Sequence, residues 1–377
     1  MESQARHKVV CAGRRFGKAL AIDTPILTSR GWSTMGDLKV NDYVFGWDGQ
    51  PTKVIATTEI MRDRPCYEMR FTGSESIICD EDHLWYAETR ASRRRSLKGN
   101  GDAFDKCVRN TAQMASMPLR IATDYNFTIP HSAAVDFDRE YKLDVAPYTL
   151  GVWLGDGTAV SGGLTLNAED AEDIVSKIRS DGVEVVKQSS DFGWGTHGLF
   201  VKLRELGVIN NKHIPENYLY ANYQDRMALV QGLMDTDGWV DPSGAVFFGN
   251  KNRQIADSLH QLVVSLGGRA RKLQKIAKLN GVEHGDFYQL HLNVDFPVFG
   301  CSRKLAAQNK LVRRGNTVRR IVGIGRVGSV PVRCITVDNF DGMFLAGRDL
   351  IPTHNSYVGG HELLPYALSA RFEANSL

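Results

Sequence analysis

The feature that most constrains this chain is a phosphate-binding loop whose two halves lie near opposite ends of the sequence. Joining Lys18 directly to Ser356 gives an apolar strand, a glycine-rich turn and a Lys-Ser pair that opens a helix. In such a loop backbone N–H groups cradle phosphates, the lysine reaches the β- and γ-phosphates, and the next hydroxyl binds Mg²⁺. In the chain as written the next residue is Ala19, which has no hydroxyl. The sequence therefore predicts that residues 19–355 interrupt the loop. The nucleotide-binding residues of the rejoined loop would be Gly13, Gly17, Lys18 and Ser356.

Length and composition set broad limits on this chain of 377 residues. The flanks 1–18 and 356–377 are too short to bury a core, so neither is expected to act as an enzyme. The net charge of +3 favours no class of partner. The six cysteines include no Cys-x-x-Cys pair, which argues against zinc and against a disulfide framework. The sequence has no apolar run of about 18 residues and no signal peptide, so we expect an intracellular protein without a membrane partner.

The secondary-structure pattern changes twice along the chain. Short β-like runs separated by Asp-Gly and Thr-Gly turns fill residues 19 to about 90 and return at 319–344. Residues 91–135 are polar and begin with a basic cluster, which fits a solvated connector better than a DNA contact. Between about 140 and 310 helices alternate with strand pairs, so the simplest account is an all-β unit split by an inserted α+β unit. We therefore divide the chain into a first flank (1–18), the first part of the β unit with its basic connector (19–135), the inserted unit (136–312), the last part of the β unit (313–355) and a second flank (356–377).

The inserted unit contains two copies of one pattern. Residues 150–157 and 231–238 are each followed by a short strand, a helix and a glycine turn, which predicts a pseudo-twofold domain. In each copy two small residues lie four apart, which puts both on one helix face and lets two helices approach closely. The helices end at Asp156 and Asp237, so close packing would bring two carboxylates together. One Gly-Asp-Gly is an ordinary turn, but two matched copies favour a divalent-metal site for phosphodiester hydrolysis.

Over roughly residues 140–310 the chain resembles the LAGLIDADG homing endonucleases, in their single-chain form with two motifs. The resemblance implies that Asp156 and Asp237 bind catalytic Mg²⁺ and that each copy's sheet lies in a major groove of double-stranded DNA. It also implies that Lys212, in Asn-Lys-His-Ile-Pro, is the catalytic lysine; the alternative is an ordinary surface lysine. Asp235 lies nearby, but the register with the first copy favours Asp237. The expected target is the host gene without the insert, around the codons that would be joined.

The end of the insert carries residues suited to cutting the chain. The side-chain nitrogen of Asn355 can attack its own carbonyl carbon and form a succinimide, and His354 can assist by proton transfer. Ser356, directly afterwards, can accept an acyl group on its oxygen and pass it to an amine. His-Asn-Ser alone would be chance. At the point where excision rebuilds a phosphate-binding loop, it predicts self-excision.

Residues 19 to about 90 and 319–355 resemble inteins. The resemblance implies an all-β, horseshoe-like Hedgehog/intein (HINT) splicing domain interrupted by the pseudo-twofold α+β LAGLIDADG domain. Inteins usually begin with Cys or Ser, so Ala19 leaves two explanations open: a replacement that inactivates splicing, or a different nucleophile. A further departure is Asp80, at a position three before His83 that is often Thr. The last departure is the absence of a second His shortly before the terminal His-Asn.

Three linked features resemble the class 3 inteins, which lack the first nucleophile. They are Trp85 two residues after His83, Cys334 in a late β run, and Thr353 before the final His-Asn. Each alone could be a structural residue, but together with Ala19 they favour this class. The resemblance implies that Trp85 and Thr353 shape the site of Cys334.

The class 3 resemblance implies a splicing route that needs no cofactor. The Cys334 thiolate attacks the Lys18 carbonyl, while His83 donates a proton to the departing nitrogen of the next residue. The acyl chain then moves to Ser356, Asn355 cyclises, and an O-to-N shift leaves the two flanks joined.

The rejoined flanks resemble the motor of phage terminase large subunits, with Ala12 at the first glycine position. This implies a DNA-packaging ATPase that uses ATP and Mg²⁺ after splicing, in a phage or prophage protein of the bacterial cytoplasm. Other P-loop ATPases are the alternative hosts. The insert itself is expected to be a monomer. Two rivals stay open: a splicing-inactive intein, and an intein whose α+β domain binds DNA without cutting it.

Overall fold

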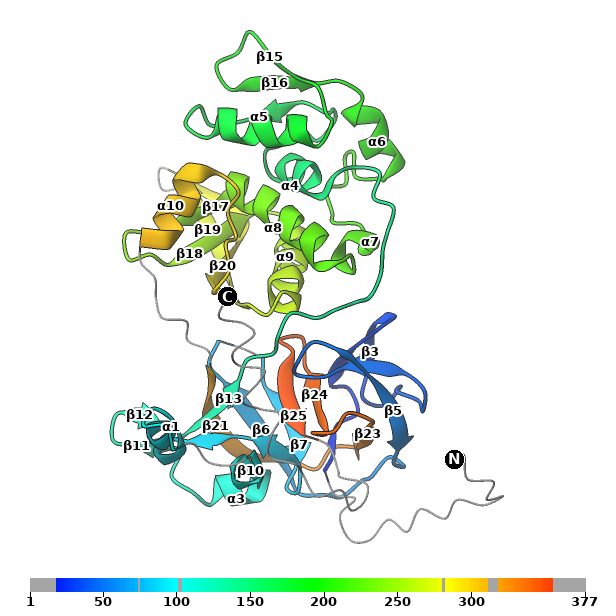
Figure 1. The fold of residues 1–377 in the computed structure, drawn as a ribbon, viewed down its shortest axis with the longest axis vertical. Helices are drawn as coiled ribbons and strands as arrows, with labels where there is room; N and C mark the ends of the chain where they lie inside the picture. Colours follow the sequence, from blue (N-terminus) through cyan, green and yellow to red (C-terminus); the bar gives the residue numbers. More distant parts are fainter. Residues whose placement is uncertain (1–17, 74, 101–103, 280–281, 311–317, 355–377) are drawn as a thin grey trace.

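The computed structural model of the chain describes residues 18–354, apart from 74, 101–103, 280–281 and 311–317. It has two lobes (Figure 1). The β lobe is built from residues 18–130 together with 318–354, and the α+β lobe from residues 145–310, with 131–144 connecting them. The predicted loop residues Gly13 and Gly17 and the predicted reactive residues Asn355 and Ser356 lie outside the described residues.

Three larger antiparallel sheets form most of the β lobe, beside a two-stranded sheet of β11 (Arg120–Ile121) and β12 (Asp124–Tyr125). The largest has the order β22 (Val332–Arg333), β1 (Leu20–Ala21), β7 (Ile77–Asp80), β6 (Cys66–Phe71), β21 (Val318–Val327), β13 (Phe127–Pro130) and β9 (Glu88–Thr89). A second has the order β23 (Ile335–Val337), β5 (Pro51–Thr57), β4 (Tyr43–Phe45), β2 (Pro25–Thr28) and β3 (Gly31–Thr34). A third has the order β10 (Val108–Asn110), β8 (Leu84–Tyr86), β25 (Ile351–His354) and β24 (Met343–Ala346).

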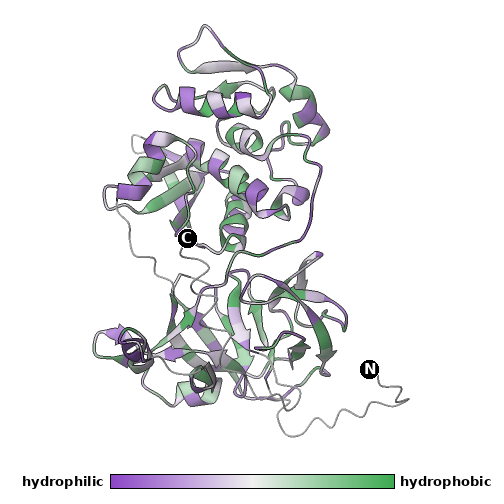
Figure 2. Cartoon of the chain, viewed as in Figure 1, coloured by the Kyte–Doolittle hydropathy of each residue, from purple (hydrophilic) through white to green (hydrophobic). Residues whose placement is uncertain are grey.

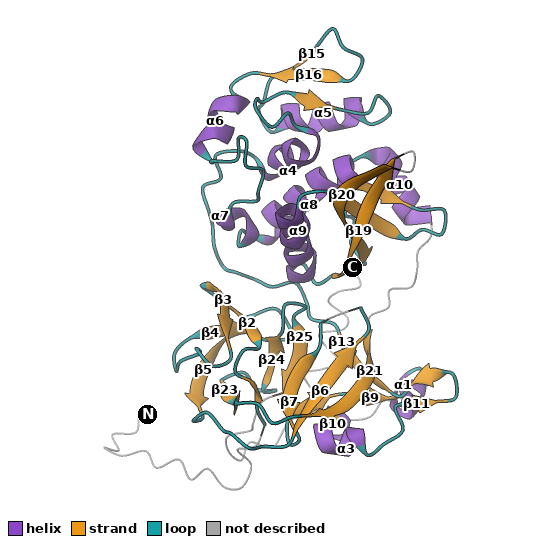
Figure 3. Cartoon of the chain, turned by 180° about the vertical axis from the view of Figure 1, so that it is seen from behind, coloured by secondary structure: helices purple, strands orange, loops and turns teal. Residues whose placement is uncertain are grey.

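Strands from the two ends of the insert alternate in these sheets. β21 lies between β6 and β13, while β22 pairs with β1, β23 with β5 and β25 with β8. Strands separated in sequence by the whole α+β lobe are therefore neighbours in space, as the view from behind also shows (Figure 3). Along the first half of β21 alternate residues are buried, among them Arg319 and Ile321, as expected for a strand with one face on a core.

Residues 91–135 are not a simple connector, contrary to the prediction. They contain α1 (Arg90–Ser96), α2 (Phe104–Cys107), β10, α3 (Thr111–Ala115), β11 (Arg120–Ile121), β12 (Asp124–Tyr125) and β13. Asn110 and Gln113 form a capping box that satisfies the first N–H groups of α3. β10 and β13 extend two of the sheets. The polar composition of this segment reflects caps and turns rather than a lack of structure.

The α+β lobe repeats one order of elements. The first copy has α4 (Pro147–Asp156), β14 (Leu164–Thr165), α5 (Ala171–Ser180), β15 (Val185–Lys187), β16 (Gly193–Thr196) and α6 (Leu199–Glu205). After α7 (Glu216–Leu219), the second has α8 (Tyr223–Asp237), β17 (Gly238–Val240), β18 (Val246–Asn250), α9 (Arg253–Ser265), β19 (Arg269–Leu279), β20 (Val282–Asn293) and α10 (Ser302–Lys310). The sheet orders, β14-β16-β15 and β17-β18-β20-β19, correspond except for the extra β17. A twofold axis relating the copies stays a prediction.

Helices α4 and α8 pack against each other through small residues. A Cβ on Gly151 would lie 2.5 Å from the Leu229 carbonyl oxygen, and one on Gly155 would lie 2.0 Å from Thr236 Oγ1. No larger side chain fits at such distances, so these glycines allow the close approach of the two helices. Pro147 begins α4 at a position where its missing N–H costs no hydrogen bond.

The lobes meet through an apolar cluster and the connecting segment. The buried members of the cluster are Leu27, Phe45, Val135, Phe137, Tyr220, Val264, Leu345 and Leu350. The buried Arg226 of α8 donates to the carbonyls of Val135 and Ser265 and so fastens the connecting segment to the α+β lobe. Hydrophobic residues follow the strands and the central helices, and hydrophilic residues follow the outer helices (Figure 2). Within the described part of the chain, no helix combines the length and apolar character needed to cross a membrane.

Candidate functional sites

The first residue of the insert lies across a strand pair from the predicted nucleophile. β1 and β22 are antiparallel with Leu20 opposite Arg333, so the next step of the register sets Ala19 opposite Cys334. Ala19 is 0% exposed and Cys334 is 2% exposed, and both belong to one apolar cluster. Ala19 and Cys334 therefore lie close together in this buried cluster.

Cys334 itself occupies a break between two sheets. The late β run in which the sequence places Cys334 is two strands, β22 in the seven-stranded sheet and β23 in the five-stranded sheet, and Cys334 falls between them. Its N–H donates to Thr58 Oγ1 at 3.1 Å, and its thiol donates to the Ile335 carbonyl at 3.3 Å. The Arg333 guanidinium donates to the carbonyls of Gly36 and Thr58 and anchors the break.

Four predicted residues converge where β25 meets β8. His83 Nε2 and Thr353 Oγ1 form a buried hydrogen bond. The ring of Trp85 lies edge-on to the ring of His83, with centroids 4.9 Å apart. His354 pairs with Leu84, so it lies next to His83 across the strand pair. All four predicted side chains are buried.

His83 lies against the carbonyl side of the Lys18–Ala19 peptide bond. Burial lowers the pKa of His83 to about 3, while the Lys18 backbone acts in the opposite direction and the positive charge of His354 adds to the lowering. Nδ1 has no hydrogen-bond partner of ordinary geometry within the described residues. The ring is therefore a neutral imidazole beside Lys18.

Thr111 links Trp85 to His83, and it was missed in the sequence. Trp85 Nε1 donates to Thr111 Oγ1 at 3.0 Å, and Thr111 Oγ1 donates to the His83 carbonyl at 3.1 Å. Thr111 is fully buried at the start of α3. Its neighbours in sequence carry no signal for this role, because the segment resembles a polar connector.

Asp80 binds both backbone groups of Ala19. The Ala19 N–H donates to Asp80 Oδ1 at 3.2 Å, and the Asp80 N–H donates to the Ala19 carbonyl at 2.9 Å. Arg64 Nε lies 2.8 Å from Asp80 Oδ2. Burial raises the pKa of Asp80 to about 6, against the opposing effects of the Ala19 N–H and of Arg64. Asp80, which stands where inteins often have Thr, thus contacts Ala19, the first residue of the predicted intein.

In the α+β lobe, Asp156 and Asp237 lie at the adjoining ends of α4 and α8. Burial raises the pKa of Asp156, and the charges of Lys304 and Lys212 oppose it. Burial also raises the pKa of Asp237 to about 6; the Asn250 amide, which donates at 2.6 Å, opposes this, and the charge of Asp156 adds to it. The two carboxylates are therefore close enough to repel each other.

Two lysines occupy matching places in the two copies. Lys212 Nζ donates to the carbonyls of Leu154, Gly155 and Gly157 at 3.0, 3.3 and 2.7 Å, at the end of α4. Lys304 Nζ donates to the carbonyls of Met234, Asp235, Thr236 and Gly238 at 3.4, 2.5, 3.4 and 2.9 Å, at the end of α8. Burial lowers the pKa of both lysines. The sequence analysis did not identify Lys304. Its position after the second copy, which matches the position of Lys212 after the first, could have indicated it.

Asp235 has a different environment from the two acids at the helix ends. It accepts the Tyr148 hydroxyl at 2.7 Å and the N–H groups of Gly300 and Cys301 at 2.9 Å. Its oxygens are therefore used to hold the loop before α10.

The pair Asp156 and Asp237 fits a magnesium ion by donor type. No three His, Cys, Asp or Glu side chains converge among the residues that the structure describes. Mg²⁺ is usually held by one or two carboxylates, with water and substrate phosphates completing its shell. Both carboxylates lie at helix C-termini, whose dipoles favour a cation.

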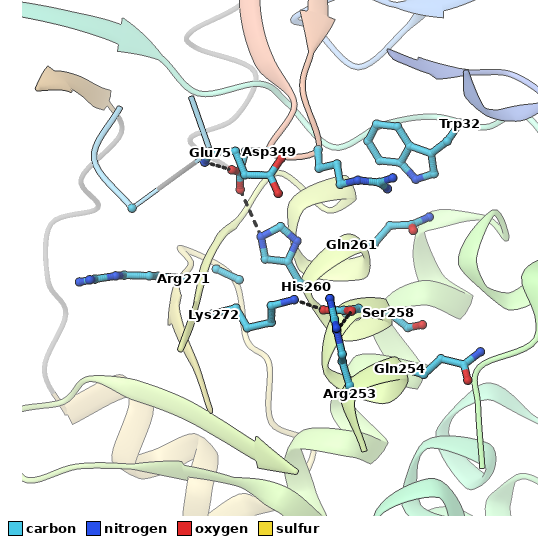
Figure 4. A pocket seen from close by; sticks show the side chains of 14 residues that line it. Trp32, Glu75, Arg253, Gln254, Ser258, His260, Gln261, Arg271, Lys272 and Asp349 are labelled. Carbon is cyan, nitrogen blue, oxygen red and sulfur yellow. Dashed lines mark hydrogen bonds and ion pairs between the residues drawn. The ribbon is translucent and has the colours of Figure 1, made fainter. Parts of the chain in front are cut away.

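A cavity of about 980 Å³ lies between α9 and the β lobe (Figure 4). His260 Nε2 of α9 is 3.1 Å from Asp349 Oδ1 of the β lobe, and the Glu75 N–H donates to Asp349 at 2.7 Å. Arg253, Arg271 and Lys272 also line it. None of the predicted site residues lies in this cavity.

Comparison with curated proteins finds long matches to two differently named mycobacterial proteins. Over 366 residues the chain is 38% identical to the replicative DNA helicase DnaB of Mycobacterium intracellulare, covering 93% of this chain and 61% of that protein. Over 296 residues it is 24% identical to an iron-sulfur cluster assembly SufBD family protein, ML0593, of Mycobacterium leprae, covering 67% of this chain and 32% of that protein. The chain thus spans less than two thirds of either relative, and neither gives support to the expected terminase host. No family model matches the chain.

Solved structures give weaker likenesses. The crystal structure of the MchDnaB-1 intein (N145AA) covers 90% of this chain and all of that one, at 18% identity and a TM-score of 0.30. The homing endonuclease I-DmoI in complex with DNA and Ca covers 45% of this chain and 98% of that one, at 14% identity and a TM-score of 0.31.

Proposed function

We propose that residues 19–355 are a class 3 intein that excises itself and ligates Lys18 to Ser356. The observation that carries the proposal is that Ala19 and Cys334 adjoin the paired residues Leu20 and Arg333 and lie in one buried apolar cluster. The His83–Thr353 pair supports it, because His83 lies against the carbonyl side of the Lys18–Ala19 peptide bond. The two curated relatives support insertion of one element into unrelated hosts, since a helicase and a SufBD family protein both match most of this chain.

The residues act in turn at the two junctions. The thiolate of Cys334 attacks the Lys18 carbonyl, and the neutral ring of His83, held by Thr353 and packed by Trp85, orients that carbonyl. The acyl chain passes to Ser356, and Asn355 cyclises with His354 beside it. None of these splicing steps is expected to need a cofactor.

A pair of variants tests this mechanism against an inactivated intein. If Ala19 stands in place of an original nucleophile, the double variant Ala19→Cys with Cys334→Ala splices. The proposal predicts that this double variant leaves the precursor uncut, while the parent chain splices. If the double variant splices and the parent chain does not, the class 3 assignment is overturned.

We further propose that the α+β lobe is a Mg²⁺-dependent homing endonuclease that acts on double-stranded DNA. Asp156 and Asp237 would hold the metal, which supplies charge stabilisation at the phosphate. Lys212 and Lys304, each with a lowered pKa, would stabilise negative charge on either side of the pair. The carrying observation is the convergence of both acids at the ends of the closely packed helices.

Cleavage of the uninterrupted host-gene site tests the nuclease proposal. A linear DNA with that site should be cut in Mg²⁺ and left intact in EDTA or by Asp156→Asn and Asp237→Asn. Metal-independent binding without nicking by the parent would instead support a DNA-binding domain that no longer cuts.

We propose that the host is a terminase-like packaging ATPase. The basis is the sequence that results when Ala12 to Lys18 are joined to Ser356. The match to DnaB favours a replicative helicase as the second candidate. The spliced full-length host distinguishes them: ATP-driven packaging of duplex DNA supports the first, and ATP-driven strand separation supports the second.

A further inference from the structure

Asp80 holds the nitrogen that must leave when the first junction is cut. Its Oδ1 accepts the Ala19 N–H at 3.2 Å, and its own N–H binds the Ala19 carbonyl at 2.9 Å. Asp80 is fully buried at the end of β7, where it lies opposite Cys66. Desolvation penalises the charge of a buried carboxylate, and here the Ala19 N–H and Arg64 are the groups that offset this cost.

We propose that Asp80, held by Arg64, is the catalytic acid that delivers a proton to the Ala19 nitrogen in the first splicing step. This rests on the proposed function of Cys334. It replaces the sequence-based expectation for His83, because His83 lies against the Lys18 backbone and Asp80 lies at the nitrogen.

The bond from Cys334 Sγ to the Lys18 carbonyl carbon forms, and the bond from that carbon to the Ala19 nitrogen breaks. The nitrogen takes one proton from the Asp80 carboxyl, which becomes a carboxylate paired with Arg64. The proton that Cys334 lost on becoming a thiolate returns through solvent to Asp80.

The groups around Asp80 suit an acid near neutral pH. Burial raises its pKa to about 6, Arg64 opposes the rise, and the charge of Asp82 adds to it. Cys66 and Cys79 are the other titratable side chains on the adjoining strand positions. By contrast, the pKa of His83 falls to about 3, so an imidazolium is scarce.

The test isolates the first step in the full chain. Asn355→Ala with Ser356→Ala stops the later steps, and hydroxylamine then releases residues 1–18 from the Cys334 thioester. The release rate is followed by mass spectrometry between pH 5 and about 9. A thiol ordinarily ionises near pH 8.5, so the parent rate should rise to about pH 6 and then level off, because the gain in thiolate offsets the loss of acid.

Asp80→Asn should slow release by about 100-fold or more, and its rate should keep rising above pH 6. Asp82→Asn is the matched control, since Asp82 also binds Arg64, at 2.8 Å, but does not contact Ala19. It should stay within about 3-fold of the parent rate and still level off, with the level region beginning at slightly lower pH because the charge of Asp82 no longer raises the pKa of Asp80. With Asn355 and Ser356 kept, Asn355 cyclisation in Asp80→Asn with Cys334→Ala at the rate of Cys334→Ala alone would establish that the variant folds. An Asp80→Asn rate and pH profile equal to the parent's would overturn the inference, whereas a parent that forms no thioester would instead overturn the proposed function.

Discussion

His83 and Thr353 stand 270 positions apart and share a buried hydrogen bond between Nε2 and Oγ1. One belongs to the first part of the β lobe and the other to the last strand of the insert. The bond can therefore form only when both ends of residues 19–354 have folded together. Under the proposed mechanism, this would make the chemistry of the first junction depend on the completed fold.

Replacing Thr353 by Val should slow splicing by roughly 10- to 100-fold, since Nε2 loses its partner in a buried site, a loss of about 1–3 kcal/mol. Thr353→Ser keeps the hydroxyl and should splice near the parent rate. The measurement is the time course of precursor and product by mass spectrometry. Equal rates for the Val and Ser variants would show that the hydroxyl has no role.

Lys304→Met should reduce DNA cleavage as strongly as Lys212→Met, because the two ammonium groups occupy matching places beside Asp156 and Asp237. Lys310, at the exposed end of α10, is the control. Nicking of each strand of a plasmid carrying the target site is scored on a gel. If Lys304→Met cuts DNA as well as the parent does, Lys304 has no role in cleavage and the prediction is wrong.

Gly151→Ala should destabilise the α+β lobe by about 1–3 kcal/mol, since its Cβ would lie 2.5 Å from the Leu229 carbonyl and would force the helices apart. DNA cleavage should fall while splicing persists. In Gly195→Ala the new Cβ would meet only the flexible Gln188 side chain, at 3.3 Å, so that variant should be nearly neutral. Thermal unfolding and cleavage are measured on both variants, and equal stability of the two would contradict the packing argument.

Asp237→Asn should stabilise the fold while abolishing DNA cleavage. The pKa of Asp237 is raised to about 6, so the native state binds its proton more tightly than the unfolded state does. The parent therefore loses stability as pH rises from about 4 to 6, and the loss is complete above that range. The Asn variant does not lose this stability. Its free energy of unfolding should therefore exceed that of the parent by about 1–2 kcal/mol at pH 8 and equal it near pH 4.

Denaturant unfolding at pH 4 and 8 measures this difference. Asp191→Asn, at an exposed position, should show no such pH-dependent gain. A destabilised Asp237→Asn at pH 8 would mean that the carboxylate is held favourably in the native state.

The sequence predicted the strands and helices with clear periodicity. The short β runs expected over 19 to about 90 and the alternating helices and strands expected between about 140 and 310 are present, among them β4, β6 and α9. Those patterns are local, so a single sequence carries them. The break at Cys334 is not local: it arises because β22 and β23 join different sheets, which depends on strands from the other end of the insert.

The site was predictable where residue type limits the chemistry. Acids at the ends of two repeated helices and a terminal His-Asn could be read directly. Thr111 and Lys304 could not, because a buried threonine and a lysine bound to carbonyls look ordinary in sequence. Asp80 was visible only as a departure from a pattern, and its contact with Ala19 comes from the pairing of β1 with β7.

The most direct test of the central claim is intact-mass spectrometry of the chain expressed as written, beside Cys334→Ala. Splicing initiated by Cys334 should give a free 337-residue insert and a 40-residue ligated flank peptide from the parent, and neither product from the variant. Both products from Cys334→Ala, formed as fast as from the parent, would contradict it.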